Sequence, residues 1–68
     1  MDEEILNMSI RKFLKKVGVT SQREIEKGIN NASATGLLAG KSSINACMTL
    51  DIAELDLKIV IEDQIKLG

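Results

Sequence analysis

Hydrophobic side chains recur at helical spacing near the start of the chain. The apolar stripe consists of Leu6, Ile10, Phe13, Leu14 and Val17. Positions three and four residues apart share one face of an α-helix, so this spacing predicts an amphipathic helix over residues 3–17. Asp2 is suited to cap the start of this helix, and Gly18 is suited to end it in the left-handed conformation.

A second helix is predicted over residues 21–35. Ser21 and Glu24 have the spacing of a capping box, in which each side chain accepts a backbone N–H of the first turn. The apolar stripe continues more thinly through Ile25, Ile29 and Ala32. Gly28 lies inside this stripe at a cost of up to about 1 kcal/mol relative to alanine, so we interpret it as a place of close helix–helix contact. Gly36 is predicted to end the helix.

From Ile44 onward the hydrophobic period changes to two, which is typical of strands with one apolar and one polar face. Residues 44–52 form the first alternating segment and residues 57–67 the second. Glu62-Asp63-Gln64 interrupts the second segment, and the pattern leaves open a single bulged strand or a loop followed by a short strand. The predicted fold is α+β in one domain, residues 1–68: two N-terminal helices (3–17 and 21–35) packed on a C-terminal antiparallel β-hairpin (44–52 and 57–67).

The small size of the chain favours association with another chain. A domain of 68 residues buries only about 60% of the surface of its unfolded chain. A lone hairpin is barely stable in water, so the helices must cover it or a second chain must extend it. A homodimer would bury the apolar side chains that lie outside the stripes, which are Ile5, Met8, Leu37 and Leu38. The sequence leaves the oligomeric state open.

The composition removes most groups that carry out chemistry. The chain has no His, Trp, Tyr or Pro, one cysteine (Cys47) and one aromatic residue (Phe13). Histidine, the side chain best suited to transfer protons near neutral pH, is therefore absent, and so are the sets of several Cys and His that usually bind zinc. Residues 36–42 are one residue short of the spacing between the glycines of a phosphate-binding loop. We expect no enzyme, no catalytic residue, no cofactor, no metal site and no small-molecule substrate.

The charge distribution suggests an alternative partner. Residues 11–41 carry seven basic and two acidic side chains, a balance of +5, whereas residues 42–68 carry five acidic and two basic ones, a balance of −3. Two helices joined by Gly18-Val19-Thr20 have the form of a helix-turn-helix, which would make the protein a small nucleic-acid-binding regulator. Its possible contact residues are Arg11, Lys12, Lys15, Arg23 and Lys27. Two features count against nucleic-acid binding. Glu24 and Glu26 put negative charge on the second helix, which would contact the bases, and the sequence pI of about 5.3 is acidic.

We expect a cytoplasmic protein. One cysteine forms no internal disulfide. The aliphatic run Ile59-Val60-Ile61 is far too short to span a bilayer, so no membrane partner is expected. Asp2-Glu3-Glu4 has the opposite sign to the start of a signal peptide.

Residues 7–26, with the sequence NMSIRKFLKKVGVTSQREIE, resemble a family of short uncharacterised bacterial proteins known as a domain of unknown function. The segments Met48-Thr49-Leu50, Leu55-Asp56-Leu57 and Ile65-Lys66-Leu67 are also similar to that family. The resemblance implies a small bacterial cytoplasmic protein and brings no activity or site residues. Together these observations favour a non-catalytic protein-interaction or self-association module, with a homodimer as one form, and nucleic-acid binding as the alternative.

Overall fold

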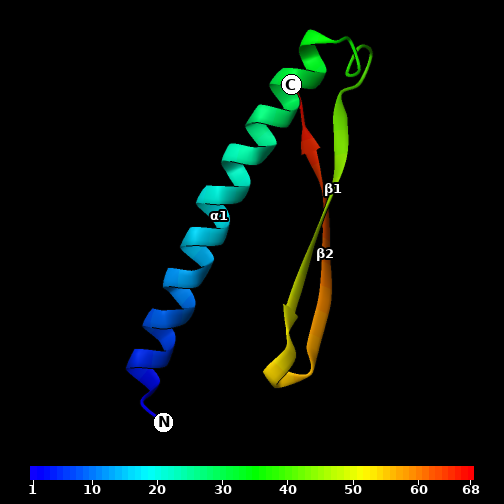
Figure 1. The fold of residues 1–68 in the computed structure, drawn as a ribbon. Helices are drawn as coiled ribbons and strands as arrows, with labels where there is room; N and C mark the ends of the chain where they lie inside the picture. The colour runs from blue at the N-terminus through cyan, green and yellow to red at the C-terminus, as the bar shows by residue number, and fades with distance from the viewer.

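One long helix and one β-hairpin make up the protein (Figure 1). The computed structural model describes residues 1–68. Helix α1 covers Glu3–Ala34, strand β1 covers Ser43–Ile52, a single 3₁₀ turn (η1) covers Ala53–Leu55, and strand β2 covers Leu57–Lys66. The α+β class and the C-terminal antiparallel hairpin are confirmed.

The prediction of two N-terminal helices is wrong, because α1 continues through residues 18–20 without a turn. Gly18 does not adopt a positive φ; among the glycines only Gly36 and Gly40 do. A break would leave backbone N–H and C=O groups unpaired at two new helix ends, whereas a glycine within a helix costs only about 1 kcal/mol. Ser21 is therefore an interior helical residue and not a cap.

Both ends of α1 are capped as the sequence suggests. Oδ1 of Asp2 accepts hydrogen bonds from the backbone N–H groups of Glu4 (3.0 Å) and Ile5 (3.2 Å). At the other end, Gly36 has φ 79° and donates its N–H to the carbonyl of Ser33 at 3.2 Å. Leu37 N–H reaches the carbonyl of Ala32 at 3.0 Å, which completes a Schellman motif. Gly36 thus ends the helix, two residues after Ala34.

The hairpin is regular along its whole length. Ten residue pairs join β1 to β2, from Ser43 opposite Lys66 to Ile52 opposite Leu57. One face carries Ile44, Ala46, Met48, Leu50 and Ile52 from β1 with Leu57, Ile59, Ile61, Asp63 and Ile65 from β2. We call this set the apolar face of the hairpin. The opposite face is polar except for Cys47 and Val60.

Neither of the two interpretations of residues 57–67 is correct in detail. β2 is a single strand without a bulge, and the register passes unchanged through residues 62–64. The alternation is kept because Glu62 and Gln64 occupy the polar face while Asp63 takes a position on the apolar face. At the hairpin turn, Asp56 adopts the left-handed conformation with φ 49°.

The protein has no closed core. None of its 68 residues is buried, although 44% of them are hydrophobic. Helix and hairpin run side by side along one axis and have almost no close backbone approach (Figure 1). The radius of gyration is 16.0 Å, whereas a compact chain of this length has about 11 Å. The predicted packing of helix on hairpin is therefore present only as a partly formed contact.

Candidate functional site

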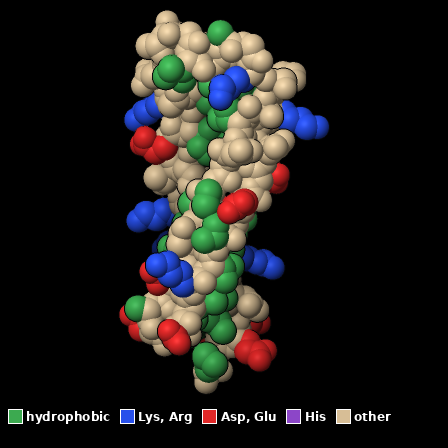
Figure 2. All heavy atoms as spheres, turned by 90° about the vertical axis from the view of Figure 1, so that its right-hand side faces the viewer, with side chains coloured by type: hydrophobic (Ala, Val, Ile, Leu, Met, Phe, Trp, Pro, Cys, Tyr) green, Lys and Arg blue, Asp and Glu red, His purple; other side chains and the backbone are tan.

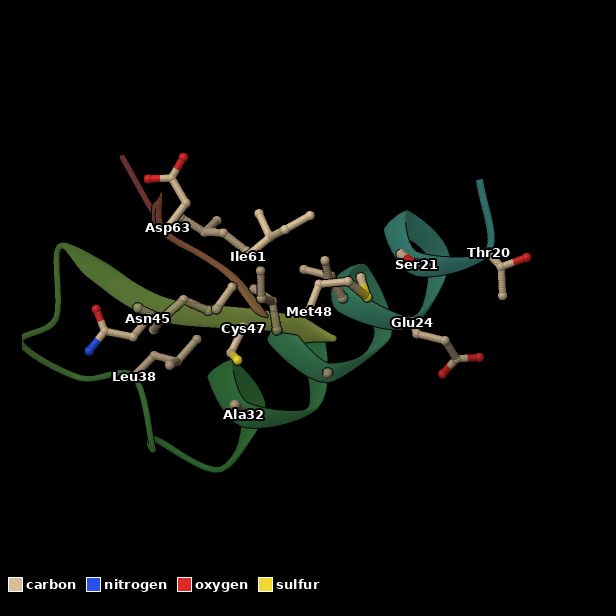
Figure 3. A pocket seen from close by; sticks show the side chains of 16 residues that line it. Thr20, Ser21, Glu24, Ala32, Leu38, Asn45, Cys47, Met48, Ile61 and Asp63 are labelled. Carbon is tan, nitrogen blue, oxygen red and sulfur yellow. The ribbon is translucent and has the colours of Figure 1, made fainter. Parts of the chain in front are cut away.

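An open groove of about 670 Å³ separates the second half of α1 from the base of the hairpin. Its apolar walls include Ile25, Ile29, Ile44, Met48, Ile61 and Ile65. Met48 and Ile61 come from the two strands, whereas Ser21, Ala32 and the residues between them come from the helix (Figure 3). The carboxylates of Glu24 and Asp63 lie at the margins and point away from the centre (Figure 3). The groove is thus suited to hold apolar side chains.

Gly28 lies in the helical wall of this groove. A Cβ atom built on Gly28 meets no atom within 4 Å. Close contact at Gly28 is therefore absent within one chain, and the interpretation of this glycine as a contact point applies only to a second molecule. A glycine weakens a helix interior by about 1 kcal/mol relative to alanine. No contact within the chain offsets this cost, because nothing packs against Gly28.

The first half of α1 carries a second unpaired apolar surface. Leu6, Ile10, Phe13 and Leu14 lie in the predicted stripe and are 40% to 54% exposed. Val17, the next residue of the stripe, is half-buried. The stripe therefore runs along the whole helix and loses its cover toward the N-terminus. Figure 2, which faces the hairpin side of the molecule, shows that hydrophobic side chains are also exposed along the long axis there, with charged side chains on both sides.

The five predicted nucleic-acid contact residues all lie on this one helix, since no turn separates them. Arg11, Lys12, Lys15, Arg23 and Lys27 are exposed. At about 100° per residue, they project from the half of α1 that is opposite the apolar stripe. The Nζ atom of Lys27 lies 3.9 Å from the Oε1 atom of Glu24, an ion pair on the helix surface. The helix-turn-helix arrangement that would place Arg23 and Lys27 on a separate reading helix does not exist.

Six of the ten acidic side chains lie at one end of the molecule. The N-terminus of α1 and the hairpin turn lie at the same end of the long axis (Figure 1). That end carries Asp2, Glu3, Glu4, Asp51, Glu54 and Asp56. We call these six residues the acidic end; Figure 2 shows Asp and Glu side chains collected there. No group of three or more acidic or cysteine side chains in the protein is arranged to hold a metal ion.

The single cysteine, Cys47, is one of the residues that line the groove. Cys47 is the only thiol and is exposed, and the chain has no histidine to activate it. No helix combines the length and the hydrophobicity that crossing a membrane requires.

Sequence reasoning identified the groove's components but missed the groove itself. The alternation over residues 44–52 and the stripe through Ile25, Ile29 and Ala32 name most of its apolar walls. The relative placement of α1 and the hairpin is the missing information, and no local pattern encodes it. The pattern predicts an interruption of the strand at Asp63, whereas the strand continues and Asp63 is a single charged position within the apolar face.

Comparison with known proteins identifies a family to which the chain is similar, and that family has no described activity. The whole chain, residues 1–68, matches the model of a family described as "Family of unknown function (DUF6494)". No curated protein and no solved structure matches it. The resemblance to a domain of unknown function is thereby confirmed.

Proposed function

The chain belongs to the family of unknown function DUF6494, and we propose that it is a non-catalytic self-association module whose working form is a homodimer. The proposal rests on the apolar surface that a single chain leaves uncovered. The proposal also places the protein in the cytoplasm, which agrees with a single cysteine that is free and exposed.

The accessible surface is the observation that carries the proposal. One chain exposes 6308 Å², whereas a compact monomer of 7.4 kDa exposes about 4,200 Å². The excess is about 2,100 Å² per chain. The chain covers about 40% of its unfolded surface, in place of the roughly 60% that is usual for this size. A partner has to supply the missing cover.

The size of this excess fits a permanent dimer of two identical chains. Covering about 2,100 Å² on each of two copies removes about 4,200 Å² from water, which lies within the range of obligate homodimer interfaces. Such interfaces resemble a hydrophobic core divided between two molecules, and their folded monomers are often unstable alone. The uncovered stripe of Leu6, Ile10 and Phe13 and the apolar groove have that character.

Sedimentation equilibrium of the purified chain tests the proposal directly. We expect a mass of two chains at micromolar concentrations and loss of helical circular dichroism together with dissociation on dilution. A folded monomer at high micromolar concentration would overturn the proposal.

A second candidate, nucleic-acid binding, keeps one supporting observation, which is the basic outer side of α1. Arg11, Lys12 and Lys15 lie there free of ion pairs. Amide shifts in labelled protein titrated with mixed-sequence duplex DNA distinguish the two functions. Contact through the basic side predicts shifts within residues 11–27, with binding that weakens by about 0.9 log units per log unit of salt for each phosphate neutralised. A spectrum unchanged by duplex at low salt would exclude this candidate.

A further inference from the structure

We infer that two copies associate antiparallel, with the first half of each α1 lying in the groove of the other copy. This inference rests on the proposed function and adds the orientation and the contact surface of the dimer. Each copy offers one unoccupied groove and one uncovered helix segment, residues 6–14. A two-fold axis across the middle of α1 lets each segment fill the other copy's groove, so the two contacts are identical.

Side-chain size along α1 supports the antiparallel direction. The first half of the stripe is large, with Leu6, Ile10, Phe13 and Val17, whereas three of its positions in the second half are small, at Ser21, Gly28 and Ala32. If the axis crosses the contact at the level of residue 19, whose side chain projects from the opposite side of the helix, residue 10 meets residue 28 of the other copy. The same register places residue 6 beside residue 32, and residue 17 beside residue 21.

Three of the four large side chains then oppose small ones, whereas Phe13 meets the partner's Ile25, which is also large. A parallel pair in register would place Ile10 against Ile10 and Gly28 against Gly28, which crowds one end and leaves a void at the other. The register also assigns a role to Gly28, whose missing side chain gives room for the partner's Ile10. Within one chain nothing occupies that space.

Charge supports the same direction. A parallel dimer would bring two acidic ends together, with six carboxylates from each copy. Like charges at that density repel and disfavour the arrangement. The antiparallel dimer places each acidic end beside the other copy's hairpin base, where Lys41 and Lys66 lie. It also aligns the two helix dipoles in opposite directions, which is the favourable orientation for neighbouring helices.

Distances between spin labels test the orientation. In a Cys47→Ser background, one label is placed near the axis by Lys16→Cys, and in a second protein one label is placed at the helix start by Glu3→Cys. Both positions are exposed and lie outside the groove. In the antiparallel dimer the two copies of residue 16 are offset by only about 9 Å along the helix axis, whereas the two copies of residue 3 are about 48 Å apart. Sedimentation of both labelled proteins first checks that they associate like the parent.

We expect a short inter-copy distance for the label at position 16 and a long one for the label at position 3. Short distances at both positions would mean a parallel dimer, and a longer distance at position 16 than at position 3 would mean contact elsewhere. Either result overturns the inference while leaving self-association in place. Absence of any inter-copy coupling together with a monomeric mass would overturn the proposed function itself.

Discussion

Ala46 lies directly opposite Asp63 in the hairpin register, so the one charge on the apolar face sits against the smallest side chain of that face. The Asp63 carboxylate accepts the backbone N–H of Gln64 at 2.7 Å and lies at the margin of the groove. Charged side chains on a sheet are a common means by which natural proteins avoid unwanted pairing with other chains. Asp63 therefore interrupts the apolar face one apolar pair before the hairpin base, where Ile44 lies opposite Ile65.

Replacing Asp63 with isoleucine tests the role of this interruption. Asp63→Ile makes the face apolar at all ten positions, so we expect species larger than the parent assembly in sedimentation velocity. Asp63→Asn removes the charge but keeps a polar side chain, and we expect it to sediment like the parent. An Asp63→Ile protein that also sediments like the parent would show that the charge has no such role.

Phe13 should be the most sensitive position of the uncovered stripe. Phe13→Asp puts a charge where the second copy packs, so we expect at least a hundredfold rise in the dimer Kd, equivalent to about 2.7 kcal/mol. Val19→Asp is the matched control, because Val19 is also exposed but projects about 120° away from Phe13 around the helix. We expect little change for it by sedimentation equilibrium. Equal effects of the two substitutions would contradict a contact through the stripe.

Substitutions at the two helical glycines distinguish an effect on groove occupation from an effect on helix propensity. Gly28→Leu and Gly18→Leu both remove a glycine from α1, and neither new Cβ meets an atom within 4 Å. Only Gly28 lines the groove. We expect Gly28→Leu to raise the dimer Kd at least tenfold because the new side chain occupies the space of the partner's Ile10. Gly18→Leu should keep the parent Kd and gain up to about 1 kcal/mol of helix stability. Tighter association of Gly28→Leu would contradict occupation of the groove by a second helix.

Alanine substitutions at two glycines should change stability in opposite directions. Gly36 has φ 79° in the Schellman motif, so Gly36→Ala should lower the free energy of unfolding by about 1 kcal/mol. Gly18 lies in regular helix, and Gly18→Ala should raise it by up to about 1 kcal/mol. Urea unfolding at one fixed protein concentration measures both, because the stability of a dimer depends on concentration. A destabilised Gly18→Ala protein would indicate that this glycine serves a contact outside the chain.

The hairpin was predictable because its signal is periodic over many residues. The alternation predicted strands at 44–52 and 57–67, and the structure has Ser43–Ile52 and Leu57–Lys66. The register is determined by the same pattern, since a slip of one residue would move every apolar side chain to the other face. Asp63 broke the alternation by type but not by geometry, which is why the continuity of β2 was not recognised.

The interruption of the helix was mispredicted because its signals are local. Gly18 and the Ser21–Glu24 spacing are each compatible with a turn and with continuous helix. The predicted basic residues keep their exposed positions, but the missing turn removes the helix-turn-helix that gave Arg23 and Lys27 a separate role. Hydrogen-bond continuity along 32 residues decided this point.

The sequence by itself determined which residues form helix and strand, which face of each is apolar, and which chemistry is improbable. These properties follow from periodicity and residue type, which act between neighbours along the chain. Only the tertiary structure decided that the helix stripe and the apolar face of the hairpin do not close on each other. Their relative placement depends on the path of residues 35–42 between Ala34 and Ser43 and on contacts between distant segments, which no local pattern records. The resulting groove and the excess surface are the features on which the proposed dimer rests.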